Sequence, residues 1–172
     1  MPDKDPNRIP DFAAIGTIEV RPCRSEDAEA VALVEASATA TLRKTYRPNK
    51  MALANKRRIS RDLERLVALL DGRVVGTTQY LVDGESIRII GLGVLAGFRR
   101  AGVARALVDS LADLASTLGL KGLVAGTVRE TGNVAVFERL GFRAVSEGPD
   151  EYSESDVYPE LSDVELRWLR EG

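Results

Sequence analysis

The pattern of hydrophobic residues divides the first third of the chain into one extended and two helical stretches. Residues 17–22 alternate as a strand does and stop at Pro22. From Ser25, a predicted N-cap, hydrophobic residues recur with helical spacing as far as residue 46. Residues 49–64 predict a second, more basic helix, whose arginines are typical of a solvated face.

The hydrophobic period changes in the middle of the chain. Three β-rich stretches between residues 65 and 94 are joined by Asp71-Gly72 and Asp83-Gly84. Asp-Gly between extended segments is a strong hairpin signal, so we predict a three-stranded antiparallel meander. Gly91 and Gly93 lie inside its last strand, where glycine indicates a bulge, a close approach by another backbone, or a bend needed for packing.

Helices and strands alternate over the rest of the chain. An apolar stripe predicts a helix over residues 101–118, which Gly119 ends. After it we expect a strand (120–128), a short helix from the N-cap Asn133 to Gly141, and two strands (142–148 and 162–170). The order β-α-α-β-β-β-α-β-α-β-β indicates an α/β architecture around a mixed sheet. We expect one domain over 17–172, preceded by a flexible, polar, proline-rich arm over 1–16.

The composition excludes several kinds of chemistry. Among its 172 residues the chain has no histidine and a single cysteine, Cys23. Serine–histidine and cysteine–histidine hydrolase mechanisms are therefore excluded, and we expect no metal site and no intramolecular disulfide. The net charge of −2 gives no global attraction for nucleic acid, so no nucleic-acid partner is expected. Without an apolar run long enough for a membrane span or a hydrophobic signal region, we expect a cytoplasmic protein with no membrane partner.

The turn "RRAGVA" before the predicted helix 101–118 combines features of an anion site. The first N–H groups of a helix lack intrahelical acceptors, and Gly102 has no side chain to keep a phosphate away from them. Arg99 and Arg100 add charged donors suited to phosphate oxygens. A P-loop is excluded because no Gly-Lys-Ser/Thr ending is present, and "GLGVLA" lacks the third glycine of a dinucleotide motif. A simple charged turn is the other interpretation.

Two motifs carry a resemblance to a known family. The stretch "LGVLAGFRRAGVARALVDSL" resembles the acetyl-CoA motif of the GNAT N-acetyltransferase superfamily, with its Arg/Gln-x-x-Gly-x-Gly/Ala core matched by Arg99, Gly102 and Ala104. Further along, "NVAVFERLGF" is similar to the second signature of that family. The element order matches from about residue 17 to 170. The resemblance implies a GNAT-like mixed, mostly antiparallel central sheet flanked by helices, and acetyl-CoA as co-substrate.

The resemblance also implies roles in binding acetyl-CoA. The main chain of residues 92–94 would pair with the pantetheine arm as an added strand, and amides from Arg100 to Arg105 would hold the diphosphate. Asn133 and the helix that follows would flank the thiol end. The implied contacts are Leu92, Gly93, Val94, Arg99, Arg100, Ala101, Gly102, Val103, Ala104, Arg105, Asn133, Ala135, Val136, Phe137 and Arg139.

The catalytic groups follow the family pattern less closely. Many members place a tyrosine acid where this chain has Phe137, which has no proton to donate. We expect the backbone amide of Val94 to polarise the thioester carbonyl. Glu130 is the first candidate for the general base, with Glu85, Tyr80, Thr127 or a chain of water molecules as alternatives. Tyr152, in the acidic loop 146–163, is a candidate substitute acid. That loop is either a solvated connection or a rim that favours cationic acceptors.

The function expected from these features is direct acetyl transfer to a primary amine in a ternary complex. The acceptor would be a small molecule or a peptide. The alternative is a regulatory or sensory module that binds CoA or acyl-CoA and has little transferase activity, because Phe137 and the absence of an obvious base weaken the catalytic pattern. A homodimer is plausible for this family, and no sequence feature decides it.

Overall fold

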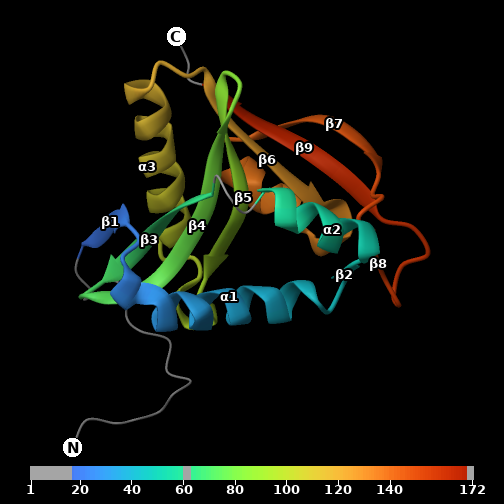
Figure 1. Cartoon of the computed structure of the whole chain (residues 1–172), viewed down its shortest axis with the longest axis horizontal. Coiled ribbons are helices and arrows are strands. Elements are labelled where there is room, and N and C mark those ends of the chain that lie inside the picture. The colour runs from blue at the N-terminus through green and yellow to red at the C-terminus, as the bar shows by residue number, and fades with distance from the viewer. Residues whose placement is uncertain (1–16, 60–62, 170–172) are drawn as a thin grey trace, which may run out of the picture.

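The computed structural model describes residues 17–59 and 63–169, which form a mixed α/β fold around a seven-stranded sheet (Figure 1). The strand order is β1-β3-β4-β5-β6-β9-β7, and every neighbouring pair is antiparallel except β5 and β6. The strands of this sheet are β1 (Ile18–Pro22), β3 (Glu64–Leu70), β4 (Arg73–Asp83), β5 (Ser86–Val94), β6 (Gly122–Val128), β7 (Arg143–Pro149) and β9 (Ser162–Leu169). The expected mostly antiparallel sheet is confirmed.

Helices cover both faces of this sheet. They are α1 (Ala28–Leu42), α2 (Lys50–Ile59), α3 (Val103–Thr117) and α4 (Asn133–Arg139). A side chain at Gly93 of β5 would meet α1, whereas one at Gly76 of β4 would meet α3, so these two helices lie on opposite faces. The larger core cluster lies on the α3 face around Leu107 and Leu111, and a smaller one lies under α1 around Val34. The expected arm over 1–16 lies outside the described residues.

The meander expected from the two Asp-Gly pairs is confirmed. Leu70 pairs with Arg73, so Asp71 and Gly72 form the two-residue loop, and both have positive φ (50° and 79°) as a type I′ turn requires. In the second hairpin Asp83 pairs with Ser86, which leaves Gly84 and Glu85 as the loop. At the end of α3, Gly119 has a φ of +69° and Leu120 N–H donates to Ala115, which completes the expected C-terminal cap.

Two expected N-caps are wrong. Ser25 begins a short 3₁₀ turn (Ser25–Asp27) before α1, and the carboxylate of Asp27 accepts the backbone N–H of Arg24 at 2.7 Å. Asn133 is the first residue of α4, after Gly132 with a φ of +80°. The hydroxyl of Thr131 accepts the N–H of Asn133 at 3.2 Å and thus takes the role expected of the asparagine side chain.

Asp27 also forms a bidentate ion pair with Arg21, with N–O distances of 2.7 and 3.0 Å. The hydrogen bonds from the Arg21 side chain, which have the larger effect, and from the Arg24 backbone lower the pKa of Asp27 from 3.8 to about 2. A carboxyl whose pKa is lower in the folded than in the unfolded state stabilises the fold above the unfolded pKa. That stabilisation is lost as the pH falls through the folded value.

We therefore expect the urea midpoint of the wild type to fall between pH 4 and pH 2 more steeply than that of Asp27→Asn. At neutral pH the variant should be the less stable protein, because Arg21 loses its charged partner. Glu26→Gln, which changes an exposed neighbouring carboxylate, should follow the wild type. Parallel curves for wild type and Asp27→Asn would contradict this account of the pH dependence.

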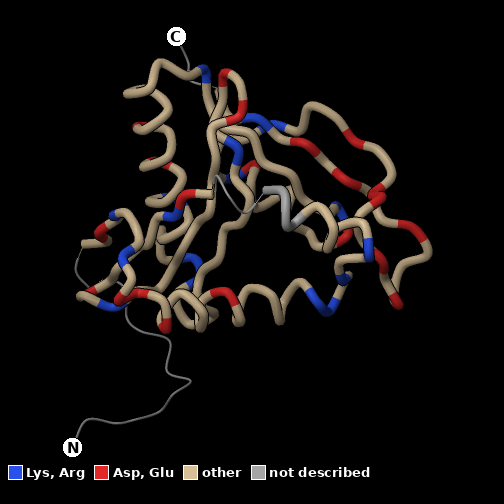
Figure 2. Tube along the Cα trace, viewed as in Figure 1, with Lys and Arg blue, Asp and Glu red and all other residues tan. Residues whose placement is uncertain are grey.

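A second, two-stranded sheet was missed by the sequence prediction. It pairs β2 (Arg47–Pro48) with β8 (Ser153–Glu154) and ties the acidic loop to the connection between α1 and α2. Arg47 forms ion pairs with Glu154 at 3.0 Å and Asp156 at 2.8 Å, and Ser155 Oγ donates to the carbonyl of Thr45 at 2.5 Å. Figure 2 shows the acidic residues spaced along β7, β9 and the segment that joins them. Hydrogen bonds and ion pairs thus hold this loop against the segment between α1 and α2, so it is more than a solvated connection.

Within the ranges 17–59 and 63–169, no helix combines the length and the apolar character needed to cross a lipid bilayer.

Candidate active site

The two parallel strands at the centre of the sheet diverge. β5 pairs with β6 only from Ser86 to Ile89, opposite Gly122 to Ala125. Beyond that point β5 continues to Val94 and β6 to Val128, but the two strands are no longer hydrogen-bonded to each other. The gap opens at the C-terminal ends of these strands, close to the start of α3 (Figure 1).

A β-bulge lies at the point where the strands separate. Tyr80 of β4 is opposite Ile89, whereas Gln79 is opposite Gly91, so Ile90 is the extra residue. The expected bulge is present, although its extra residue is Ile90 rather than a glycine. At Gly93 a Cβ would lie 3.1 Å from the Cβ of Ala38, because α1 packs closely against β5 there.

Beyond the bulge, the backbone of β5 presents alternate residues to the gap. The N–H of Leu95 donates to Val75 of β4, and the carbonyl of Gly91 accepts the hydroxyl of Thr78. Because peptide groups alternate along a strand, Gly93 also faces β4, opposite Thr77. The N–H and C=O groups of Leu92 and Val94 therefore face the gap. Residues 92–94 therefore differ in which strand their backbone groups face: the N–H and C=O of Gly93 face β4, and those of Leu92 and Val94 face the gap.

A pocket of about 490 Å³ lies along this gap and reaches the start of α3. Of the residues that the family resemblance implied, it is lined by Leu92, Gly93, Val94, Arg99, Arg100, Gly102, Val103, Ala104, Arg105, Asn133, Val136 and Arg139. Ala101, Ala135 and Phe137 do not line it; the ring of Phe137 packs edge-to-face on Phe142 with centroids 5.2 Å apart. The sequence prediction missed Ala38, Thr41 and Leu42 of α1, together with Phe98 and Leu140.

The turn before α3 has the geometry of an anion site. Arg100 and Gly102 both adopt left-handed backbone conformations, with φ of 63° and 83°. That conformation costs about 1–2 kcal/mol for a residue with a side chain, so Arg100 marks a locally strained turn. The first intrahelical bond runs from Ala106 N–H to the Gly102 carbonyl, which leaves the N–H groups of residues 103–105 without intrahelical acceptors. No side chain in the described part of the chain caps them.

Four arginines line the same pocket as these amides: Arg99, Arg100, Arg105 and Arg139. Arg99 donates to the carbonyl of Val94 at 3.4 Å and to the hydroxyl of Thr41 at 3.2 Å, and Arg105 donates to the carbonyl of Arg139 at 2.6 Å. None of the four arginines is paired with a carboxylate in the described part of the chain. Positive charge and free backbone donors therefore converge at this end of the pocket.

The candidate acid and base lie away from the pocket walls. Glu130 accepts the backbone N–H of Ser162 at 3.0 Å and so holds the start of β9. Tyr152 precedes β8, where its carbonyl accepts the N–H of Asn49. Neither residue lines this pocket or the second one described next. Of the candidate catalytic groups, only the backbone amide of Val94 therefore lines the gap.

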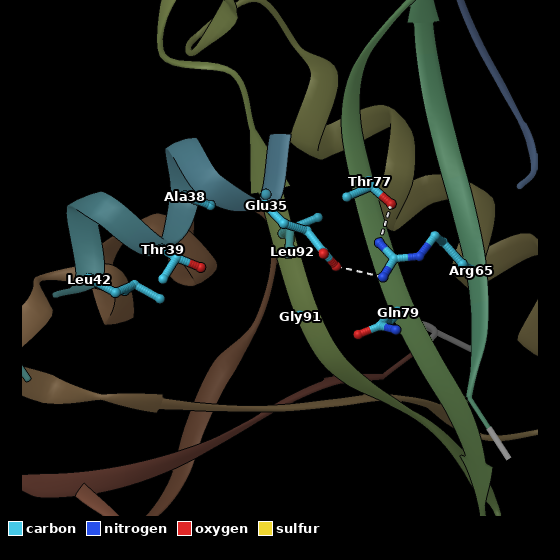
Figure 3. Close-up of a pocket in the computed structure, with 10 residues that line it drawn as sticks. Glu35, Ala38, Thr39, Leu42, Arg65, Thr77, Gln79, Gly91 and Leu92 are labelled. Atoms are coloured by element: carbon cyan, nitrogen blue, oxygen red, sulfur yellow. Dashed lines mark hydrogen bonds and ion pairs between the residues drawn. The ribbon is translucent and has the colours of Figure 1, made fainter. Parts of the chain in front are cut away.

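A second, smaller pocket of about 240 Å³ opens on the α1 face of the sheet (Figure 3). It shares Ala38, Leu42, Leu92 and Gly93 with the first pocket, so the two pockets are neighbours at β5. Its polar walls are Glu35, Arg65, Thr77 and Gln79, which the sequence prediction missed. They come from α1, β3 and β4, and no local spacing in the sequence indicates that such distant residues meet.

Comparison with known proteins agrees with this geometry. The model of the acetyltransferase (GNAT) family matches residues 33–142, which include most of α1, the meander, the turn before α3, and α4. The chain belongs to the GNAT acetyltransferase family, and acetyl-CoA is its co-substrate. The site fits that co-substrate, because strand amides that face the gap, helix amides without intrahelical acceptors, and arginines without a carboxylate partner among the described residues all line the larger pocket.

Solved structures share the fold at low sequence identity. An IAA acetyltransferase from Bacillus cereus has a TM-score of 0.66 at 16% identity, with 90% of this chain and 100% of that chain covered. The ribosomal-protein-S18-alanine N-acetyltransferase from Escherichia coli gives 0.67 at 17%, with 91% and 97% covered. A Bacillus subtilis acetyltransferase in complex with CoA gives 0.65 at 16%, with 90% and 100% covered. No curated protein sequence matches the chain significantly.

Proposed function

We propose that this acetyltransferase transfers the acetyl group directly to a primary amine in a ternary complex. The observation that carries the proposal is that the two pockets adjoin, with Leu92 and Gly93 lining both of them. A donor in the larger pocket and an acceptor in the smaller one would meet across β5, with no protein side chain needed as an intermediate carrier. Cys23 lines neither pocket, so nothing favours an acyl-enzyme.

The larger pocket would hold acetyl-CoA by its backbone and its charge. The N–H and C=O groups of Leu92, which face the gap, would pair with the amides of the pantetheine arm, as an added strand does. The amides of residues 103–105 and the side chains of Arg99 and Arg100 would hold the diphosphate. These contacts would hold the thioester near Leu92 and Gly93, the residues of β5 that line both pockets.

The transfer step needs few protein groups. The nitrogen of a neutral amine attacks the thioester carbon, the new C–N bond replaces the C–S bond, and CoA leaves as a thiol with an ordinary pKa of about 8.5. We propose that the Val94 amide donates a hydrogen bond to the carbonyl oxygen as charge develops there. Glu130 and Tyr152 stay candidates for base and acid. Because neither lines a pocket, we expect the proton to leave the amine through water.

The test is acetyl-CoA turnover, followed as release of free thiol, against a panel of amines, with thermal shift by CoA measured in parallel. We expect CoA to stabilise the protein and at least one class of amine to be acetylated. Stabilisation without turnover across the panel would instead support a CoA-binding module, and no stabilisation would contradict both functions. The cytoplasmic location and a homodimer remain predictions, which fractionation and analytical ultracentrifugation test.

A further inference from the structure

The smaller pocket contains a pair of opposite charges whose hydrogen-bonding capacity is only partly used. The guanidinium of Arg65 donates to Thr77 Oγ1 at 2.9 Å and to Glu35 Oε1 at 2.5 Å (Figure 3). Two of its five N–H donors are used in this way, which leaves three. The other carboxylate oxygen of Glu35 bonds to no residue that the structure describes.

The position of Arg65 is fixed by its surroundings. Its side chain is 18% exposed, whereas that of Glu35 is 48% exposed, so the arginine forms the floor of the pocket and the carboxylate lies at its edge. Thr77 itself is buried and its hydroxyl donates to the carbonyl of Leu66. A guanidinium held in this way presents its remaining donors in a preorganised fork, which suits a carboxylate.

The row of residues across the sheet leads from this fork toward the bulge. Arg65 of β3 is opposite Gln79 of β4, and Gln79 is opposite Gly91 of β5. The side-chain amide of Gln79 forms no hydrogen bond with any residue in the described ranges. At Gly91 no atom of residues 17–59 or 63–169 lies within 4 Å of the place that a Cβ would occupy, so among these residues the row ends in open space beside Leu92.

Charge and size restrict what this space accepts. Among the described residues that line it, Arg65 and Glu35 are the only charged ones, so this part of its wall carries one positive and one negative charge. A purely anionic ligand would approach Glu35, and a purely cationic one would approach Arg65, each at an electrostatic cost. A zwitterion satisfies both charges. The volume of about 240 Å³ is below the range of about 300–1,000 Å³ usual for ligand pockets, which indicates a small acceptor.

Resting on the proposed function, we infer that the acceptor is a small free amino acid, with its carboxylate bound by Arg65 and Gln79 and its amino group over Gly91. The free oxygen of Glu35 accepts a hydrogen bond from the ammonium as the acceptor enters. Loss of one proton to water then leaves the neutral amine, which attacks the thioester. The products are an N-acetyl amino acid and CoA. Arg65 acts here as the residue that determines specificity.

The first test compares each proteinogenic amino acid with its own methyl ester, by thiol release at constant acetyl-CoA. The ester keeps the amine and side chain but removes the carboxylate charge. We expect kcat/KM for the best amino acid to exceed that for its ester at least about tenfold, the value of one charged hydrogen bond. Equal rates, or acetylation of polyamines and peptides alone, would overturn this inference and leave the proposed function intact. No turnover of any amine would overturn both.

The second test uses Arg65→Gln. We expect its KM for the amino acid to rise about tenfold to hundredfold, with KM for acetyl-CoA and kcat/KM for the ester unchanged. Arg65→Lys, which keeps the charge but loses the fork, should fall between wild type and Arg65→Gln. The matched control is Arg143→Gln, an exposed arginine on β7, which should behave as wild type. Equal losses on acid and ester would show a merely structural role and overturn the inference.

Discussion

Replacing Gly102 by aspartate is expected to raise KM for acetyl-CoA about hundredfold or more. The carboxylate would lie beside the free amides of residues 103–105 and compete with the diphosphate for them. Loss of one or two charged hydrogen bonds at about 1.5–3 kcal/mol each accounts for that magnitude. Isothermal titration with CoA measures the effect directly, and kcat at saturating acetyl-CoA should change much less.

Backbone strain has to be separated from charge in this variant, because Gly102 has a φ of +83°. The matched control is Gly84→Asp in the β4–β5 hairpin, where the glycine has a φ of +60° and open space around it. Both variants carry the same charge and a similar backbone strain of about 1–2 kcal/mol. Gly84→Asp should lose stability but keep its affinity for CoA. Equal CoA affinity in the two variants would place the diphosphate elsewhere.

Gly76→Val is expected to give the largest loss of stability, about 2–3 kcal/mol or more. A Cβ at Gly76 would lie 2.5 Å from Cγ1 of Val103 and 3.3 Å from Cδ1 of Leu107, both buried in the main core. Relief of this overlap requires α3 to move away from β4. Because Val103 is the first residue of α3, the free amides would move too, and KM for acetyl-CoA should rise together with the loss of stability.

Gly148→Val on β7 is the control for Gly76→Val. It introduces the same side chain into a strand, but no atom lies within 4 Å of the new Cβ. Its free energy of unfolding, measured with urea, should stay within about 0.5 kcal/mol of the wild type. If Gly76→Val unfolds at the same urea concentration as Gly148→Val, the packing of α3 on β4 is not as described.

Local patterns account for the parts of the fold and the site that could be predicted from sequence. Asp71-Gly72 specifies a type I′ turn through the φ values it tolerates, and the alternation on either side sets the pairing of the strands. Gly102 and its neighbouring arginines identify the anion turn because all its donors lie within a few residues. Glycines at 91 and 93 indicated an irregular strand, and the bulge lies next to them at Ile90.

Contacts between distant residues account for what was missed. Arg65 meets Glu35 across 30 positions, and Arg47 meets Glu154 across 107, and neither pair has a periodic or motif signal in the chain. The direction of the peptide at Gly93 also depends on pairing with β4, since the bulge at Ile90 shifts the alternation by one residue. Asn133 has the composition of an N-cap, but Thr131 already supplies the hydroxyl that this helix start needs.

Amide hydrogen exchange of β5, measured by NMR with and without saturating CoA, tests most directly the claim that acetyl-CoA binds in the gap between β5 and β6. In the free protein the N–H groups of Leu92 and Val94 face the gap, whereas those of Gly91 and Gly93 face β4. We predict that CoA slows exchange at Leu92, Val94 and residues 103–105, and leaves Gly91 and Gly93 unchanged. Unaltered exchange at Leu92 and Val94 in the saturated complex would contradict this binding mode.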